Sequence, residues 1–376
     1  MAVLSSFLIV AFLAGVVGAL QIPTLSLFLS VELKAESAAI GVFYAINAGI
    51  GIGVSFWLAA LSDRLCIRRR LLIFCYIMAV CNSLIFAYSR DYLVLLIVGS
   101  FLAAVANTAT PQLFALAREY NASPTFNALM RAQLSLAWII GPPLAFNITA
   151  AAGFKMMYLL SAAVFAPILL LTMMLPANRK VAIRPKVLTD IRSNGMPDIK
   201  VGLLFVTSVL MWSCSALYLI DMPLFVSQRL GLPEQSIGLI MGVAAAVEIP
   251  VMLLAGRYVE RLGKKQMLSW SLYAGMIFYS VLPFATSLWQ LLFLQLINAL
   301  FIGIIATVGM FFFQALLPDK QGVATTFFTN SVSVGIIFAG VLHVLLTKNG
   351  KHEYVYIIAA ILLLTARFIL RKVQEK

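Results

Sequence analysis

The sequence predicts an all-α integral membrane protein with twelve transmembrane helices arranged in two six-helix bundles. Of its 376 residues, 62% are hydrophobic and only 11% are charged, whereas soluble domains carry about 25% charged residues. The mean hydropathy is +1.00, and apolar runs long enough to cross a hydrocarbon core about 30 Å thick recur along the chain. A basic stretch near the midpoint divides these runs into two equal sets.

The apolar runs follow one another with only short polar interruptions. The first run has no basic leading segment and is too long for the core of a signal peptide, so we expect it to be a retained span. The predicted spans are residues 3–29, 38–61, 71–89, 92–117, 127–151, 155–175, 201–225, 236–256, 266–285, 288–316, 322–346 and 354–371.

Lysine and arginine are distributed unevenly between the two sides of these spans. With the N-terminus inside, the inner segments hold 21 of these residues and the outer loops hold 6. Because basic residues are retained on the cytoplasmic side, both termini are predicted to be cytoplasmic. The net charge of +13 is spread over short loops rather than over one solvated face, which argues against a nucleic-acid partner.

The longest hydrophilic stretch, residues 178–200, is predicted to be a cytoplasmic linker. It separates an N-terminal bundle, residues 1–177, from a C-terminal bundle, residues 201–376. An acidic residue, an arginine and a basic cluster follow the second span, and the same order follows the eighth span. Parallel repeats of this kind are typical of transporters whose substrate site lies near the midplane between the halves. The residues of the two copies that we expect to act in conformational change are Asp63, Arg64, Arg68, Arg257, Glu260 and Arg261.

Glu248 lies in the middle of the eighth span and is followed by a proline. An ionisable group at the centre of a bilayer costs about 2.5–3.5 kcal/mol on insertion scales and usually faces protein or a wet cavity. We therefore expect Glu248 to accept hydroxyl groups of a substrate or to take up a coupling proton. The alternative is a structural carboxyl group that forms hydrogen bonds between helices.

Asp221 and Trp212 belong to the seventh span. Asp221 is near its outer end and shares a helical face with Tyr218 and Cys214. It could pair with a cation or close an outer gate, or it could be a polar helix end near the headgroups. Trp212 lies roughly opposite Asp221 on a straight helix and is a candidate for stacking on a ring of the substrate.

Four amide side chains in the spans offer hydrogen-bond donors and acceptors together, which suits the recognition of hydroxyl groups. For any single amide, hydrogen bonding between helices is an equally good interpretation. The four are Gln21, Asn107, Gln295 and Asn298.

The remaining polar candidates carry less information. Arg131 begins the fifth span and could pair with Glu119, pair with a carboxylate in the cavity, or extend to the inner interface. His343 and His352 lie near the outer side without an evident partner, so we expect no function for them. The sequence contains no nucleotide-binding loop, no Ser/His/Asp arrangement and no metal-ligand cluster, so it predicts neither an enzyme nor a cofactor.

Several strings of residues resemble known transporters. The loop with Asp63 and Arg64 resembles the loop motif of the major facilitator superfamily, and Gly141-Pro142 resembles its antiporter motif, so we expect Gly141 and Pro142 to act in conformational change as well. Longer strings look like the bacterial sugar efflux transporters across essentially the whole chain. These strings are residues 18–28 (GALQIPTLSLF), 106–120 (ANTATPQLFALAREY), 130–138 (MRAQLSLAW) and 220–224 (IDMPL).

This resemblance implies the major facilitator fold, with spans 1, 4, 7 and 10 bordering the cavity. It also implies export of sugars or glycosides, such as lactose and glucose, by proton antiport. We expect a monomer in the lipid bilayer of a bacterial inner membrane. A drug or amphipathic-solute exporter is the alternative in the same class, and the amides favour the sugar. A membrane sensor or assembly subunit is the alternative in another class, but neither the linker nor the tails are long enough for a folded domain.

Overall fold

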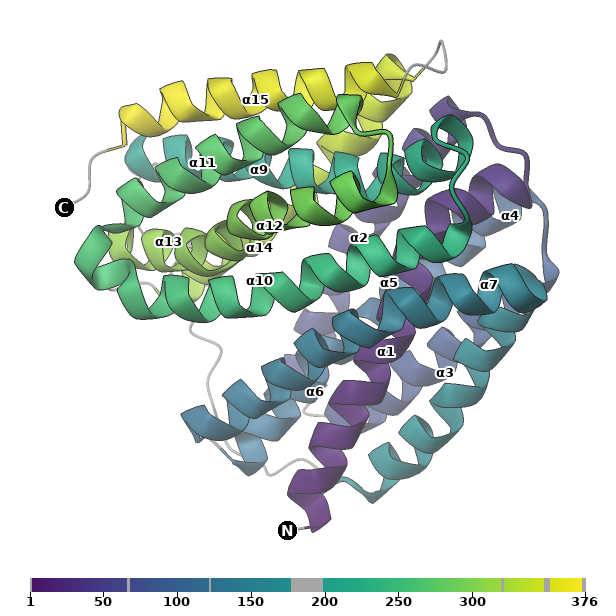
Figure 1. Cartoon of the computed structure of the whole chain (residues 1–376). Helices are drawn as coiled ribbons and strands as arrows, with labels where there is room; N and C mark the ends of the chain where they lie inside the picture. Colours follow the sequence, from purple (N-terminus) through teal and green to yellow (C-terminus); the bar gives the residue numbers. More distant parts are fainter. Residues whose placement is uncertain are drawn as a thin grey trace. The chain divides into compact units, whose positions relative to one another are not determined.

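The computed structural model describes residues 2–65, 68–121, 123–176, 199–318, 321–347 and 352–373. Side chains are described in these ranges except at positions 2, 59, 60, 62–65, 124, 125, 127, 128, 321 and 322. Every regular element in the described ranges is a helix (Figure 1). Eleven of these helices are long and apolar enough to cross a membrane. The predicted all-α membrane fold is therefore confirmed.

The described residues of the first half of the chain form eight helical elements. They are α1 (Ala2–Val31), α2 (Ser37–Leu65), α3 (Arg68–Tyr88), α4 (Tyr92–Val94), η1 (Leu95–Gly99), α5 (Ser100–Asn107), α6 (Ala109–Tyr120) and α7 (Pro124–Met174). Helix α7 contains two of the predicted spans. Gly153 separates them, with φ 79° and ψ 167°, a conformation that residues with a side chain rarely adopt. The eleven helices of membrane-crossing length therefore accommodate the twelve predicted spans.

The second half contains ten helical elements in the described residues. They are α9 (Ile199–Leu224), η2 (Phe225–Arg229), α10 (Glu234–Leu262), α11 (Lys264–Val281), η3 (Leu282–Phe284), α12 (Leu288–Ile304), η4 (Ile305–Gly309), α13 (Met310–Leu316), α14 (Gln321–Leu346) and α15 (Glu353–Arg371). The predicted linker, 178–200, lies outside the described residues except for its last two positions, with which α9 begins. The elements η1, η2 and η4 are π-helical turns in spans 4, 7 and 10, and such turns occur frequently at functional sites.

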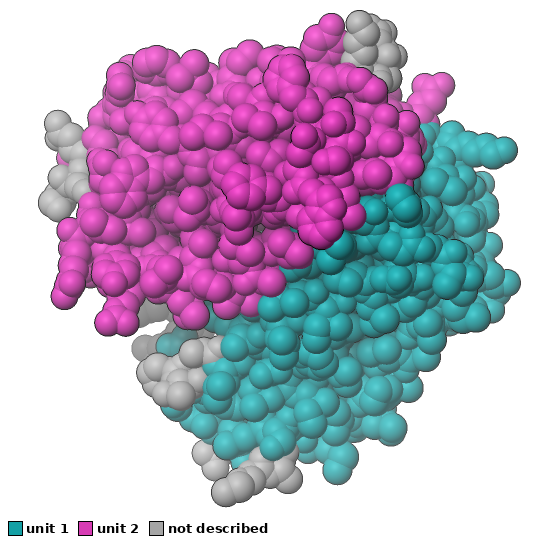
Figure 2. All heavy atoms as spheres, in the orientation of Figure 1, with its two compact units in different colours: residues 1–35, 46–184, 233–242 teal, residues 36–45, 185–232, 243–376 magenta. Residues whose placement is uncertain are grey.

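The chain forms two compact units, which Figure 2 colours separately. Unit 1 comprises residues 1–35, 46–184 and 233–242, and unit 2 comprises residues 36–45, 185–232 and 243–376. Two helices are divided between the units, α2 after residue 45 and α10 after residue 242. The division of the sequence into bundles at the linker stays a prediction.

In unit 1, helix α1 packs along α7, and α3 packs against α5, α6 and α7. The core between these helices is apolar, with Phe7, Leu72 and Met130 fully buried. The closest approach is at Gly141 of α7, where an added Cβ atom would lie 2.3 Å from Cβ of Ala19. Small residues let membrane helices approach closely, so Gly141 has a packing role whether or not it also acts in conformational change.

Substituting Gly141 by alanine is expected to destabilise unit 1 by about 1–3 kcal/mol, because overpacking forces backbone shifts. The measurement is thermal unfolding in detergent. Gly49→Ala is the matched control, since a Cβ atom at Gly49 meets nothing within 4 Å and alanine is the better helix former. Equal melting temperatures for the two variants would contradict the assignment of Gly141 to the α1–α7 contact.

In unit 2, α9 packs against α14 and α15, and α11 packs against α12 and α15. Buried aromatic rings of Tyr218, Phe278 and Tyr279 meet edge to face. The start of α2 lies directly on α14, because a Cβ atom added to Gly41 would be 2.5 Å from the Gly340 carbonyl oxygen. This glycine pair brings the two backbones into contact.

Large apolar side chains cover much of the outer surface of the helices. Leu253 is 70% exposed, Phe293 is 68% exposed and Trp289 is 79% exposed. Soluble monomers rarely expose extensive apolar patches. This surface is therefore suited to contact with lipid, as expected of a multi-pass membrane protein.

Candidate functional site

The first candidate group is the carboxylate of Glu248, midway along the 29 residues of α10. Its side chain is half-buried. Among the described residues, no hydrogen bond or ion pair occupies this carboxylate. Such a group in the middle of an apolar span remains available for a proton or for a hydroxyl group of a substrate.

Helix α12 approaches α10 closely beside Glu248. A Cβ atom added to Gly303 would lie 3.2 Å from the Glu248 carbonyl oxygen and 2.8 Å from Cγ1 of Val251. The backbone around Glu248 is therefore fixed by a tight helix contact within unit 2. A carboxylate on a rigid helix is better placed for repeated proton exchange than one on a loop.

The two amides of α12 are buried in a hydrogen-bonded group with α9. Gln295 and Asn298 are at most 1% exposed. The Tyr218 hydroxyl donates to Oε1 of Gln295 (3.2 Å), and Nδ2 of Asn298 donates to the same oxygen (3.0 Å). This arrangement favours the alternative that these amides join helices. Their role in substrate binding stays a prediction.

The two amide candidates of unit 1 are Gln21, which is half-buried, and Asn107, which is exposed. Gln21 donates a hydrogen bond to the Ser83 hydroxyl (2.8 Å). Asn107 ends α5 and is exposed in the middle of the Tyr92–Tyr120 span. An exposed amide at that depth is suited to a wet surface rather than to lipid, so Asn107 is the stronger of the two candidates.

Arg131 is exposed on α7. The carboxylate of Glu119, the predicted partner of Arg131, instead forms an ion pair with Nη1 of Arg68, at 3.0 Å. Arg68 belongs to the first copy of the loop motif, and Glu119 lies at the end of α6, so this ion pair joins two helices of unit 1. The side chains of Asp63 and Arg64, in the same motif copy, lie outside the described residues.

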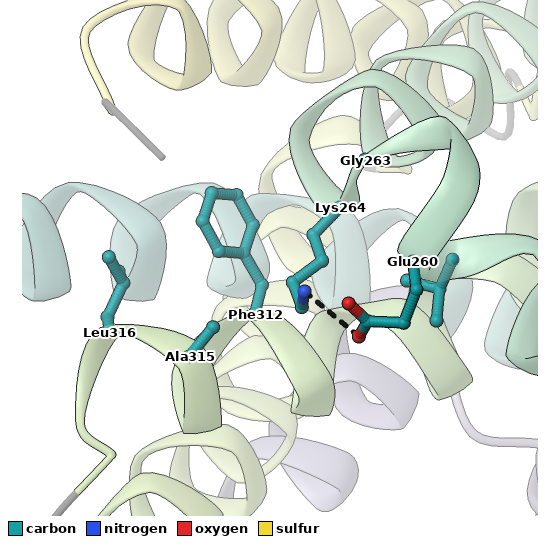
Figure 3. Close-up of a pocket in the computed structure, with 7 residues that line it drawn as sticks. Glu260, Gly263, Lys264, Phe312, Ala315 and Leu316 are labelled. Atoms are coloured by element: carbon teal, nitrogen blue, oxygen red, sulfur yellow. Dashed lines mark ion pairs between the residues drawn. The ribbon is translucent and has the colours of Figure 1, made fainter. Parts of the chain in front are cut away.

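The second copy of the motif lines one side of a hollow of about 220 Å³, and Phe312, Ala315 and Leu316 of α13 line the other. Figure 3 shows the Glu260 carboxylate facing the Lys264 ammonium there, with 3.1 Å between the paired atoms. Gly263 separates α10 from α11 with φ 80°, a conformation that glycine adopts without the steric cost of a side chain. Arg257 and Arg261 are exposed on the same turn of α10.

The Gly141-Pro142 pair lies in unit 1 on α7. A Cβ atom added to Gly238, at the start of α10, would be 2.7 Å from the Pro142 carbonyl oxygen. The motif therefore packs against α1 through Gly141 and against the first turns of α10 through Pro142. Close packing of small residues is suited to helices that slide or rotate on one another.

Trp212 is half-buried on α9, and its ring lies edge to face with that of Phe328, with centroids 6.1 Å apart. Its Nε1 atom is buried without a hydrogen-bond partner among the described residues. An unpaired indole N–H is able to donate to a bound ligand, but its role in stacking stays a prediction.

The structure corrects the expectation that the two histidines have no partner. Asp221 is fully buried at the end of α9. Its Oδ1 atom lies 2.7 Å from Nδ1 of His352 and 3.3 Å from Nε2 of His343. The three side chains form a buried acid–imidazole cluster, which we call the Asp221 cluster.

Sequence reasoning missed this cluster because its members are 122 and 131 residues apart. A signal was nevertheless present. Asp221 and His343 lie near predicted outer ends of spans, His352 lies in the following outer loop, and a buried carboxylate needs a partner. Matching ionisable groups by predicted depth across spans would have suggested the contact.

His352 lies just outside the spans and makes stability depend on pH. Burial alone would lower the pKa of His352, but its hydrogen bond to Asp221 and the charges of Asp221 and Glu353 raise it above the ordinary value of 6.5. The folded protein therefore binds more protons than the unfolded chain above pH 6.5.

Thermal stability is accordingly expected to fall as pH rises from about 6.5 through the raised pKa of His352, because the contribution is complete only below the unfolded value. The melting temperature in detergent, followed from pH 6 to 9, measures this. His352→Gln should flatten that part of the profile. A wild-type melting temperature that increased with pH over this range would contradict the assignment.

The comparisons with known proteins agree on one family. The model of the Major Facilitator Superfamily matches residues 7–282 and 203–376. Sugar efflux transporter A of Escherichia coli (strain K12) is 48% identical over 99% of this chain and 96% of its own length. Sugar efflux transporter B of Salmonella typhimurium is 41% identical over 99% of this chain and 95% of its own length.

Solved structures show the same fold at lower identity. The crystal structure of a point mutant of the nucleoside transporter NupG aligns with a TM-score of 0.84 over 99% of both chains at 18% identity. At that identity the likeness concerns the fold alone. This structural likeness and the full-length relatives support the same assignment. The chain belongs to the Major Facilitator Superfamily and, within it, to the sugar efflux transporters, which are membrane transporters and not enzymes.

Proposed function

We propose that this protein exports a neutral sugar or glycoside from the cytoplasm in exchange for entering protons. The observation that carries the proposal is the full-length identity of 48% to a protein named Sugar efflux transporter A. An identity of this size over whole chains is consistent with the same class of substrate. The proposed sugar site lies near the middle of the spans, where transporters of this architecture bind their substrates.

Glu248 is the candidate for proton coupling. It is half-buried in the middle of α10, and its carboxylate has no ion-pair partner among the described residues. A carboxylate that no cation neutralises exchanges protons more readily than one held in an ion pair. Asn107 and Trp212 are candidates for contacts with the sugar, through hydrogen bonds and ring stacking.

The energetics of the exchange are adequate. One charge that moves through 100 mV releases about 2.3 kcal/mol, enough to sustain a gradient of about 50-fold for one-to-one exchange. We place the protein as a monomer in the lipid of a bacterial inner membrane with both termini in the cytoplasm, because 21 of 27 basic residues fall on the predicted inner side.

Counterflow of labelled sugars in proteoliposomes tests the proposal. Flux of at least one sugar or glycoside is expected, and an imposed pH difference should drive its accumulation against a gradient. Absence of flux for every glycoside, with flux of amphipathic drugs instead, would refute the sugar. Sugar flux indifferent to the pH difference would refute proton antiport.

A further inference from the structure

Both ring nitrogens of His343 face hydrogen-bond acceptors. Nδ1 lies 3.1 Å from the carbonyl oxygen of Ser37, and Nε2 lies 3.3 Å from Oδ1 of Asp221. A neutral imidazole has one N–H donor and one acceptor nitrogen, whereas a carbonyl oxygen and an ionised carboxylate only accept. A neutral His343 beside an ionised Asp221 therefore makes only one of the two bonds.

One additional proton allows both bonds. It resides either on His343, which then has two N–H donors, or on Asp221, whose O–H then donates to Nε2 of His343. In both cases the Asp221 cluster holds one proton more than an ionised carboxylate with two neutral imidazoles. While His352 is neutral, the net charge of the cluster is then zero, the state that burial favours, and the side chains of Asp221 and His343 are 0% exposed.

His352 connects this buried pair with the loop. Its Nδ1 atom lies 2.7 Å from Oδ1 of Asp221, the length of a charge-assisted hydrogen bond. Its side chain is 6% exposed, and it lies in the turn before α15. An imidazole that gains a proton on Nε2 and donates one from Nδ1 is a proton shuttle, so His352 is suited to pass protons between loop water and Asp221.

Other ionisable groups around the cluster do not neutralise Asp221. Arg229 and Glu353 bind each other at 2.8 Å. The hydroxyl of Tyr356 interacts with Asp221 both electrostatically and as a hydrogen-bonding group, although neither this hydroxyl nor Oδ2 of Asp221 has a partner at good hydrogen-bond geometry among the described residues. Phenols are neutral near pH 7. Tyr356 of α15 interacts in turn with the phenols of Tyr218 on α9 and Tyr279 on α11.

We propose that Asp221, His343 and His352 form a proton-binding site whose proton fastens the first turn of α2 to α14. The fastening bond is the one from Nδ1 of His343 to the Ser37 carbonyl oxygen. When the proton leaves, the single N–H of His343 donates to the ionised carboxylate of Asp221, the stronger acceptor, and the bond to the Ser37 carbonyl oxygen is lost. The proposal rests on the proposed function in that release and uptake of this proton would belong to the export cycle.

Ser37, which accepts the hydrogen bond from His343, lies in the part of α2 that belongs to unit 2. Residues 36–45 belong to unit 2, and the rest of α2 belongs to unit 1. Beyond Ser37, the contact between Gly41 and Gly340 leaves no room for side chains, so the two backbones touch over more than one turn. The additional proton therefore adds a directional bond at an interface where the two backbones pack closely.

The two histidines of the cluster are the only histidines in the chain, which permits a direct test. Protein carrying ring-¹⁵N histidine and a histidine-free affinity tag is studied by NMR in detergent, with H352Q to assign the signals. At pH 7 Nδ1 of His343 is expected to carry a proton in both cases, and the ring signals are expected to change as the additional proton leaves the cluster at higher pH. Signals of a neutral ring that do not change as pH rises would overturn the proposal.

A second measurement tests the fastening of α2. Spin labels at positions 36 and 345, in a background without native cysteines, report the distance between α2 and α14. A broader and longer distance distribution is expected once the NMR signals show loss of the proton, and H343Q should show it at every pH. Labels at positions 270 and 368, on α11 and α15, are the control. An unchanged distance between positions 36 and 345 while the proton is lost would refute the fastening.

Sugar flux in the same preparations separates the two proposals. Wild-type protein that shows the expected NMR and distance changes but no glycoside flux would refute the proposed function and leave the proton site intact. Proton-driven sugar export by protein whose two imidazoles are neutral at pH 7 and indifferent to pH would refute the proton site alone.

Discussion

Replacing Glu248 by glutamine is expected to remove the response of sugar export to a pH difference. Glutamine has nearly the same shape but does not exchange a proton. Because the Glu248 carboxylate has no ion-pair partner among the described residues, the substitution breaks no described contact and the fold should persist. In proteoliposomes, proton-driven accumulation should fall from as much as about 50-fold to none, while counterflow of the sugar continues.

The control for this experiment is Glu234→Gln, the same chemical change at the start of the same helix. The Glu234 carboxylate accepts a hydrogen bond from the Thr149 hydroxyl at 3.2 Å, and an amide oxygen is able to accept it as well. Glu234→Gln should keep its pH response. If Glu248→Gln exported sugar with full pH dependence, Glu248 would not be the coupling group.

The second large effect is expected on stability. Asp221→Ala removes the acceptor of both imidazoles in a site that is fully buried. Removing one partner of a buried hydrogen-bonded ion pair typically costs about 3–5 kcal/mol, because the remaining groups stay desolvated without a partner. We therefore expect a large decrease of the melting temperature in detergent and loss of the pH dependence that His352 contributes.

Asp221→Asn is the matched variant, since its amide oxygen still accepts a hydrogen bond. It should lose less stability than Asp221→Ala. Where Asp221→Ala does not accumulate in the membrane, Asp221→Asn still provides the comparison of pH profiles. If the Asp221→Ala variant melted at the same temperature as the wild-type protein, the cluster would contribute nothing to stability.

The helices could be predicted from the sequence almost completely. Each span satisfies its own backbone hydrogen bonds and is stabilised by the apolar character of about 20 neighbouring residues, so the information is local. The predicted span 288–316 has the same limits as Leu288–Leu316 of the structure. The division of α7 was predicted as well, because Gly153, with its positive φ, lies between the predicted spans 127–151 and 155–175.

The candidate site could be predicted only in part. Glu248 stands out in the sequence because a charge in an apolar run is costly in itself. The sequence did not distinguish a substrate-binding amide from a structural one, since Asn107 and Asn298 have the same side chain in equally apolar surroundings. The structure distinguishes them by exposure, with Asn298 buried against Gln295 and Asn107 exposed.

The sequence by itself determined the class of protein, the number of spans and the single acid at the centre of α10. Only the tertiary structure decided which polar side chains meet. His343 and His352 have no evident partner along the chain but share the Asp221 carboxylate in the fold. The reason is physical: the free energy of inserting a span is summed over neighbouring residues, whereas a hydrogen bond between helices depends on how distant segments pack.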